Sequence, residues 1–370
     1  MIFTINKYLL AFALVFILAI FAKLYLKVLY NPAIVLIFIL SFLTLFIFGF
    51  KINKKAFFDY WYFLLIPIFM IFSLEFNFFD YAKFFYSSAL FFVLGILFYK
   101  FGYFSKNDSY PIIVSILTFL ITIYILIFVD LSFDSRELNP NFVGLFVYLF
   151  FIASICGFKK SSFKIIILII TLVITSYVQS RASLLSLIVF SLVYSLWPLI
   201  YRIPKLFIFL LSLLFLAVCY AYIYFTSTMQ IEILFFFFDL QSDAQSFYTG
   251  RENLWSRILF DIQSNYFFGQ GVGFQKDLLG GLANSAHNLF LQLYIQGGLV
   301  SVFLIIAFFI RLFFFSFSKK KEGRNMGSII ISLFTLCMFE VFIIENNIAY
   351  GLLLFSILAF EQGKLSNQTS

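Results

Sequence analysis

The sequence predicts an all-α membrane protein that crosses the bilayer many times, and three observations carry this prediction. Of the 370 residues, 63% are hydrophobic and 11% are charged, which is more apolar surface than a water-soluble fold can hide. The apolar residues gather in runs of roughly 17–22, long enough to cross a hydrocarbon core as helices. Lys and Arg cluster in the short loops between these runs. The net charge of +8 therefore indicates orientation in a lipid bilayer, and no basic-aromatic module for nucleic acid accompanies it.

We expect about twelve membrane-spanning helices, nine of them before one long loop. These nine are expected at roughly 8–22, 32–50, 57–73, 85–99, 111–130, 141–157, 163–179, 182–199 and 206–226. The apolar stretch 163–199 would be about 55 Å long as one helix, nearly twice the thickness of the bilayer core. It must therefore fold back, and Gln179-Ser180-Arg181 is its only polar break.

The rest of the chain divides into a loop and three further spans. Residues 227–297 hold no clear span, and their aromatic residues and helical patterns predict a large, folded loop with short helices. Spans are expected again at 298–317, 327–344 and 347–361. The predicted regions are thus 1–226, the loop 227–297, and 298–370 with a final tail. Glu340 falls inside a span, where a charge is costly, so we expect it to face the bundle or a cavity.

The loop charges orient the chain. If the N-terminus lies inside, one side of the membrane receives most of the basic loop residues, namely Lys51, Lys54, Lys55, Lys159, Lys160, Lys164, Arg202, Lys205, Lys319, Lys320, Lys321 and Arg324. The positive-inside rule makes that side the cytoplasm. Both termini are then cytoplasmic, and the loop 227–297 lies outside.

Arg251 lies at a predicted helix start within the long loop. Thr249 and Glu252 have the spacing of a capping box, and Leu254, Ile258 and Ile262 recur at i+4 to form one apolar face. Free N–H groups of a first turn together with a guanidinium suit a phosphate or pyrophosphate. The alternative is that Arg251 anchors the loop at the lipid headgroups.

His287 is the only histidine in the chain. We expect Asn284 or Ser285 to cap a helix from about 286 to 296, ended by Gly297-Gly298, with His287 in its first turn. The positive end of a helix disfavours imidazolium, and a neutral imidazole suits a general base. A polar loop residue without a chemical role is the alternative.

Other candidate site residues lie on the same predicted side. Arg181 opens the eighth span there, either as part of a site or as an interfacial anchor. Asn139-Pro140-Asn141 most simply caps the sixth span with Pro at N1. The candidate residues lining a cavity are Arg136, Asn139, Asn141, Trp255 and Asn288.

Neither a metal nor a cofactor is expected. The sequence has no HExxH, no DxD and no second histidine. Gly269-Gln-Gly-Val-Gly273 predicts a turn, because no βαβ unit surrounds it. The three cysteines lie inside apolar runs without a CxxC pattern, which predicts buried packing residues: Cys156, Cys219 and Cys337.

These motifs, in this order, resemble the O-antigen polymerase and O-antigen ligase superfamily of bacterial envelope glycan assembly. The resemblance covers roughly residues 130 to 320. It rests on Asn139-Pro140-Asn141, Ser180-Arg181-Ala182, Gly250-Arg251 with Trp255, Phe268-Gly-Gln-Gly-Val-Gly273, Ala286-His287-Asn288 and Gly297-Gly298-Leu299.

The resemblance implies a GT-C-like glycosyltransferase of the bacterial inner membrane that needs no metal and no nucleotide sugar. Its donor would be a glycan on undecaprenyl pyrophosphate at the outer leaflet. Arg181 and Arg251 would bind the pyrophosphate, and His287 would deprotonate the acceptor hydroxyl, which attacks the anomeric carbon with inversion.

The resemblance is compatible with two activities, which differ in the acceptor. A polymerase transfers the glycan to another lipid-linked repeat unit, whereas a ligase transfers it to the lipid A core. The compact chain favours a polymerase, with a ligase as the alternative and a chain-length regulator as a candidate partner. A lipid-linked oligosaccharide flippase is disfavoured, because its charges would lie at the membrane midplane.

Overall fold

The structure is a computed structural model that describes residues 54–74, 78–105, 108–128, 140–203, 265–272, 286–318, 323–341 and 348–367, and isolated positions elsewhere. Within these residues the regular structure is helical and contains no strand. The helices are α3 (Lys54–Tyr60), α4 (Tyr62–Met70), α5 (Phe78–Phe104), α6 (Ser109–Phe128), α7 (Pro140–Gly157), α8 (Ser161–Tyr177), α9 (Arg181–Ile200), α15 (Leu289–Ser318), α16 (Arg324–Cys337) and α17 (Ile348–Asn367).

Several expected spans match the helices closely. The predicted bounds of α6, α7, α8 and α9 lie within two residues of those observed. The span expected at 57–73 is divided at Trp61 into α3 and α4, and the span expected at 327–344 ends at Cys337. The spans expected at 8–22, 32–50 and 206–226 fall mainly outside the described residues.

Five of the described helices are long and apolar enough to cross a membrane by length and composition: α5, α6, α9, α15 and α17. Shorter apolar helices accompany them in α7, α8 and α16. This agrees with the predicted all-α membrane protein. The total of twelve spans stays a prediction.

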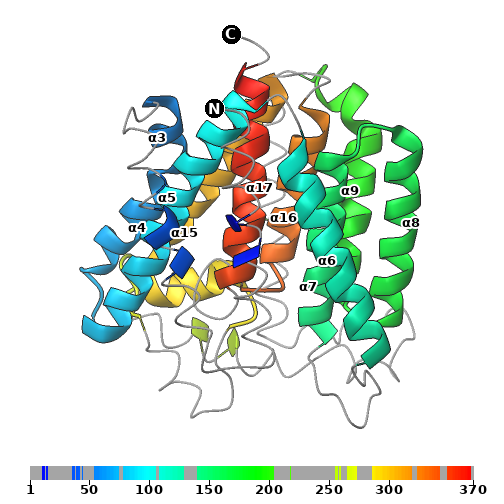
Figure 1. Cartoon of the computed structure of the whole chain (residues 1–370). Helices are drawn as coiled ribbons and strands as arrows, with labels where there is room; N and C mark the ends of the chain where they lie inside the picture. The colour runs from blue at the N-terminus through cyan, green and yellow to red at the C-terminus, as the bar shows by residue number, and fades with distance from the viewer. Residues whose placement is uncertain are drawn as a thin grey trace, which may run out of the picture.

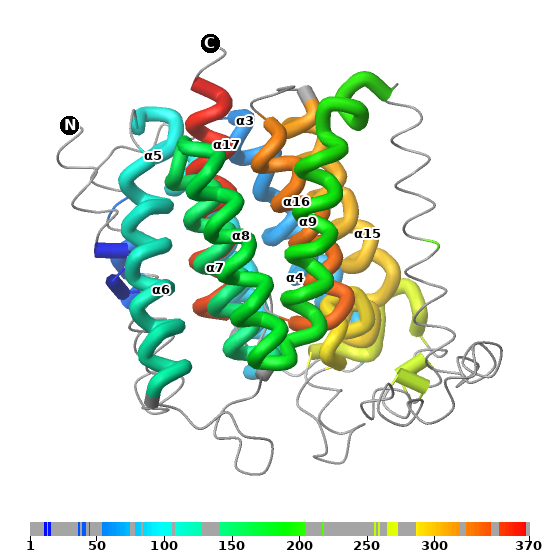
Figure 2. The backbone as a smooth tube through the Cα atoms, turned by 90° about the vertical axis from the view of Figure 1, so that its right-hand side faces the viewer, coloured from blue at the N-terminus to red at the C-terminus, as the bar shows by residue number. Residues whose placement is uncertain are grey.

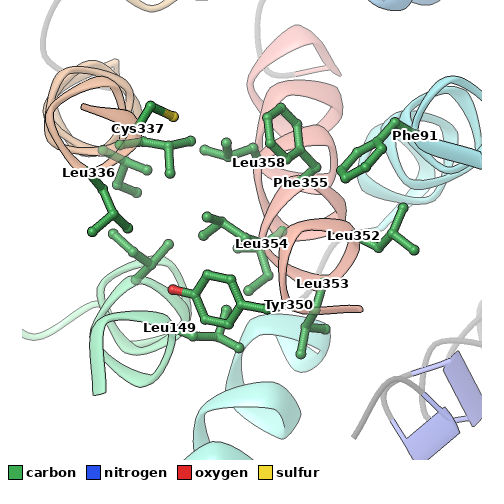
Figure 3. Close-up of a cluster of buried hydrophobic side chains, with 14 of the residues drawn as sticks. Phe91, Leu149, Leu336, Cys337, Tyr350, Leu352, Leu353, Leu354, Phe355 and Leu358 are labelled. Atoms are coloured by element: carbon green, nitrogen blue, oxygen red, sulfur yellow. The ribbon is translucent and has the colours of Figure 1, made fainter. Parts of the chain in front are cut away.

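α17 is the central helix of the bundle (Figure 1). It packs against α5, α7 and α16 and is almost wholly buried. Figure 3 shows its leucines and Phe355 facing Phe91 of α5, Leu149 of α7 and Cys337 of α16. α5 and α17 touch through their backbones, since a Cβ at Gly102 would overlap the carbonyl oxygen of Phe360. Buried Cys156 and Cys337 agree with the packing role expected of the cysteines; Cys219 lies outside the described residues.

The helices α7, α9 and α15 begin at the same end of the bundle. Short connections make α7, α8 and α9 antiparallel neighbours, as Figure 2 shows. Trp197, near the end of α9, contacts Phe313 and Phe317, near the end of α15, so α9 and α15 run in the same direction. We call the end where they begin the histidine end, because His287 precedes α15, and the opposite end the lysine end.

The lysine end carries the described basic residues of the loops that were predicted to be cytoplasmic. They are Lys54, Lys55, Lys159, Lys160, Lys164, Arg202 and Arg324. Buried carboxylates join the helices there. Asp59 of α3 accepts hydrogen bonds from Arg311 Nε of α15 at 2.5 Å and from Gln362 Nε2 of α17 at 2.6 Å. Asp108 pairs with Lys364 of α17, and with Lys159 at 3.6 Å.

Candidate functional site

Arg181 is placed at the histidine end by a tight turn between α8 and α9. Gln179 adopts a left-handed conformation with φ 61°, and the backbone N–H groups of Gln179 and Ser180 donate to Ser176 and Thr175, each at 3.1 Å. This pair of bonds is the Schellman arrangement that ends many helices. It confirms the predicted fold-back at 179–181 and makes Arg181 the exposed first residue of α9.

The start of α7 packs beside the start of α9. A Cβ at Gly144 would overlap the Ser180 hydroxyl, so only a glycine admits this contact. Asn141 lies one turn before Gly144 on α7, and therefore at the same end as Arg181. α7 begins at Pro140, as the cap pattern predicts. The other candidates of this segment, Arg136 and Asn139, lie outside the described residues.

Asn288 caps α15 and sets where His287 lies. Its Oδ1 accepts hydrogen bonds from the backbone N–H groups of Phe290 at 2.9 Å and Leu291 at 3.1 Å, which are donors without a helical partner at a helix start. α15 therefore begins at Leu289, and His287 precedes the cap instead of lying in the first turn. The expected helix start at residue 286 is wrong, because the capping side chain comes from Asn288. Asn288 itself, a candidate cavity residue, is wholly buried.

The turn at His287 is strained and held by neighbouring side chains. His287 has φ 50°, a left-handed conformation that costs a residue with a Cβ about 1–2 kcal/mol. Next to it, the Ala286 N–H donates to Gln292 Oε1 at 2.9 Å, and the Ala286 carbonyl accepts from Trp255 Nε1 at 2.9 Å. Both polar backbone atoms of the residue before His287 are thus bonded to buried side chains.

Trp255 and Gln292 therefore belong to the surroundings of His287. Trp255 was a candidate cavity residue, and the structure buries its side chain completely. Gln292 was missed by the sequence reasoning. The available signal was a buried-looking glutamine on the apolar segment Leu289-Phe-Leu-Gln292 that follows the histidine.

Glycines fix the direction of the helix that follows His287. Gly297 and Gly298 interrupt α15, and Gly298 has φ 64° and ψ −165°, a region accessible essentially to glycine alone. The segment 289–296 lies across the lower end of the bundle before α15 turns upward (Figure 1). This agrees with the predicted helix end at Gly297-Gly298.

The glycine motif 268–273 docks on this kink. Gly269 has φ 77°, and a Cβ there would lie 2.6 Å from the backbone nitrogens of Gly297 and Gly298. The backbone N–H of Leu299 donates to the carbonyl of Tyr266 at 2.9 Å, and that of Gln270 donates to Ile295 at 2.6 Å. The described part of the motif, up to Val272, is therefore a turn, as predicted.

The described residues bring Arg181, Asn141 and His287 to one end of the bundle. Arg251, the third residue expected at the site, lies outside the described residues. Glu340 follows α16 at the same end and is buried, with 6% of its surface exposed, which is the environment expected for it. Among the residues that the structure describes, no group of three or more His, Cys, Asp or Glu could hold a metal ion.

Residues 163–306 match the sequence model of the family described as O-antigen ligase. The match extends from α8 through the kink of α15 and includes Arg181, Arg251 and His287. No curated protein matches the chain. Members of the family are glycosyltransferase-like enzymes, ligases and polymerases, that act on lipid-linked glycans in surface polysaccharide biosynthesis. The chain therefore carries an O-antigen ligase family domain at residues 163–306, which confirms the O-antigen ligase and polymerase superfamily indicated by its motifs.

Proposed function

We propose that this protein polymerises undecaprenyl-pyrophosphate-linked oligosaccharide repeat units into a surface polysaccharide at the outer face of the bacterial inner membrane. One observation carries the proposal. The segment that matches the family contains Arg181, Arg251 and His287 in order, and the two described members of this set share one end of the bundle. A cation at a helix start and an imidazole at the same end of the bundle are suited to a leaving pyrophosphate and an acceptor hydroxyl.

Each of these residues has a separate role in the proposed reaction. His287 accepts the proton of the acceptor hydroxyl, whose oxygen attacks the anomeric carbon of the donor glycan. A new glycosidic bond forms as the bond to pyrophosphate breaks, with inversion at that carbon. Arg181 and Arg251 stabilise the negative charge that the pyrophosphate gains as it leaves, and a fixed guanidinium fork suits its oxygens. No nucleotide sugar or metal takes part in this scheme.

The charge distribution supports the proposed orientation. Most of the described basic residues lie at the lysine end, with Arg181 an exception, and the positive-inside rule assigns the lysine end to the cytoplasm. The histidine end then faces outward, where the lipid-linked donor is presented. Both chain termini are cytoplasmic in this arrangement.

A ligase is the second candidate. The matching family is described as O-antigen ligase, and a ligase would use the same donor and the same base. The compact size and the Phe-rich spans of the sequence resemble a polymerase more than a ligase. The two candidates differ in the acceptor alone.

One complementation experiment tests the chemistry and the acceptor together. Surface glycolipids of a deletion strain are separated on a gel, with the strain carrying an empty vector, the wild-type gene, His287→Ala or Arg181→Ala. A polymerase predicts a single repeat unit on the core in the deletion strain, whereas a ligase predicts a core without glycan. Loss of the base should reduce transfer by roughly 10²–10⁴-fold, so His287→Ala should not restore the wild-type ladder.

Two controls make this result interpretable. Membrane fractions must contain equal amounts of the variants, and Ser301→Ala, in a buried position of α15 beyond the kink, should restore the ladder. Full restoration by His287→Ala would overturn the proposed chemistry. A deletion strain with unchanged surface glycolipid would overturn the proposed function altogether.

A further inference from the structure

We propose that Gln292 and Trp255 are positioning residues that hold the His287 backbone in its left-handed conformation and so aim the imidazole at the acceptor. The inference rests on the proposed function, because it assumes that His287 acts as the base. In this proposal neither Gln292 nor Trp255 contacts the substrate. Their action passes through the backbone of Ala286.

One of the two hydrogen bonds falls on the peptide group that sets φ of His287, and the other falls on the peptide group one residue earlier. Trp255 Nε1 donates to the carbonyl of Ala286, which belongs to the peptide group directly before the Cα of His287. The Ala286 N–H, on the preceding peptide group, donates to Gln292 Oε1. On the other side of His287, Asn288 caps the helix through its Oδ1. The strained residue is thus flanked by fixed backbone on both sides.

The sequence positions explain why these two side chains can reach Ala286. A helical side chain points back toward the start of its helix, so Gln292 returns along α15 to a residue six positions earlier. Its own backbone N–H bonds to the Asn288 carbonyl at 2.9 Å, within the regular helix. Trp255 comes from 31 positions earlier, and it follows Arg251 by four residues.

The hydrogen bond from Trp255 to Ala286 connects two parts of the proposed site, the segment predicted to hold Arg251 and the turn of His287. Trp255 is helical, in the segment where the sequence predicts the Arg251 helix. A bond from Trp255 to the turn of His287 therefore ties that segment to the base. Loss of the indole N–H should disturb the turn even when the ring is kept.

A simple packing role for Gln292 makes different predictions from a positioning role. If Gln292 only fills space, a methionine of similar shape should serve equally well. If its oxygen holds the Ala286 N–H, methionine should fail and glutamate, which retains a carboxyl oxygen at that place, should restore function. Trp255→Phe is the matched change on the other side, because it removes the N–H donor and keeps an aromatic ring.

The single histidine allows the turn to be observed directly. Full-length protein labelled with ¹³C- and ¹⁵N-histidine in lipid nanodiscs, purified through a tag without histidine, gives the backbone and ring signals of His287 alone. We expect wild-type protein to show Cα and carbonyl shifts of a left-handed residue. Gln292→Met and Trp255→Phe should move or split these signals, whereas Gln292→Glu and Ser301→Ala should leave them at the wild-type positions. An unchanged His287 spectrum in Gln292→Met would overturn the inference.

A kinetic measurement then tests whether the turn matters for catalysis. Misplacing a base by about 1 Å can cost up to roughly 10²-fold in rate, so Gln292→Met should lower kcat by about 10–100-fold, with KM for the lipid-linked donor changed less than about twofold. Gln292→Glu should recover most of this loss.

The outcomes separate this inference from the proposed function. An inactive His287→Ala together with a fully active Gln292→Met would overturn the positioning role and leave the proposed function standing. A fully active His287→Ala would overturn the proposed chemistry, while the histidine spectrum would still decide whether Gln292 and Trp255 hold the turn.

Discussion

At the lysine end charged side chains join the helices in addition to close backbone contacts such as that of Gly102 with Phe360, whereas at the histidine end the described contacts run mainly through backbone atoms and glycines. Asp59 connects α3 to α15 and α17 through Arg311 and Gln362. At the other end, the kink of α15 rests on the turn 265–272 through backbone hydrogen bonds. The two described non-glycine residues with positive φ, Gln179 and His287, also lie at the histidine end.

This difference indicates where the molecule tolerates change and where it does not. Charged pairs between long side chains can adjust by small rotations, so the lysine end is suited to holding helices together. A backbone contact fixes position much more narrowly, since neither partner can rotate away. The candidate base lies within a strained turn and Arg181 follows one, and each turn leads into a helix start, which is typical of sites that must hold a fixed geometry.

The largest effect is expected at the histidine end, from Gly298→Ala. Its φ of 64° and ψ of −165° exclude other residues, and an added Cβ would overlap the Phe267 carbonyl. We expect the free energy of unfolding to fall by roughly 2–4 kcal/mol, measured by thermal unfolding in detergent. Glycan transfer should fall as well, because the segment 289–296 can no longer keep its direction.

Gly297→Ala is the matched control for this prediction. Gly297 has φ −137°, which other residues adopt, and its Cβ would meet the side-chain ends of Ser301 and Met70. It should therefore cost less stability than Gly298→Ala. Equal stability of the two variants would show that the backbone conformation of the kink is not what fixes the histidine end.

A smaller effect is expected at the lysine end, from Asp59→Asn. The variant keeps the shape of the side chain but weakens the bond to Arg311 and leaves Gln362 Nε2 facing an amide. Since Asp59 is buried and the Arg311 side chain is 42% exposed, we expect a loss of about 1–3 kcal/mol in the free energy of unfolding. The rate of glycan transfer per folded molecule should stay unchanged.

Lys159→Ala removes an exposed ion pair and is compared with Asp59→Asn, which weakens a buried one. The Lys159 side chain is 83% exposed and lies 3.6 Å from Asp108, so its loss should cost less than about 1 kcal/mol. A large drop in kcat for Asp59→Asn at full stability would contradict the assignment of the lysine end to stability alone.

Hydrophobic periodicity and loop charge were sufficient to predict much of the fold. Runs of apolar residues locate α6, α7, α8 and α9 closely, and the length of 163–199 requires the turn at Gln179. The boundary between α3 and α4 at Trp61 was not predictable, because Trp61 keeps helical backbone angles and is neither a glycine nor a proline. The buried pairing of Asp59 with Arg311 joins residues 252 positions apart, a separation that local patterns do not record.

The candidate site was predictable by residue type but not by local geometry. The lone histidine, the arginine after a polar break and the glycine pairs all stand out in the sequence. The helix is capped by Asn288 instead of Asn284 or Ser285, because the Asn288 side chain is the one that reaches the unbonded N–H groups of the first turn. The sequence cannot distinguish them, since all three residues are of types that cap helices. The role of Gln292 appears only when its oxygen is seen to return to Ala286.

A further moderate effect is expected where the lysine end also uses a backbone contact. Pro198 lies inside α9 and has no N–H, so it cannot bond to the carbonyl of Tyr194 four residues earlier. Arg324 of α16 takes its place: Nε donates to the Tyr194 carbonyl at 2.7 Å, and the guanidinium lies 3.6 Å from the centre of the Tyr194 ring. Arg324→Ala should therefore lower the free energy of unfolding by roughly 1–2 kcal/mol, without a change in kcat.

A double-mutant cycle with Pro198→Ala tests the stated cause. This substitution restores a backbone N–H that can donate to the Tyr194 carbonyl, so Arg324→Ala should cost less in the Pro198→Ala background, by about 0.5–1 kcal/mol. Thermal unfolding of the four proteins measures this coupling. Equal cost in both backgrounds would mean that Arg324 stabilises α9 only by stacking on the ring of Tyr194. A reduced cost would show that the lysine end, too, relies on a backbone contact where proline has removed a donor, so that the contrast between the two ends is one of degree.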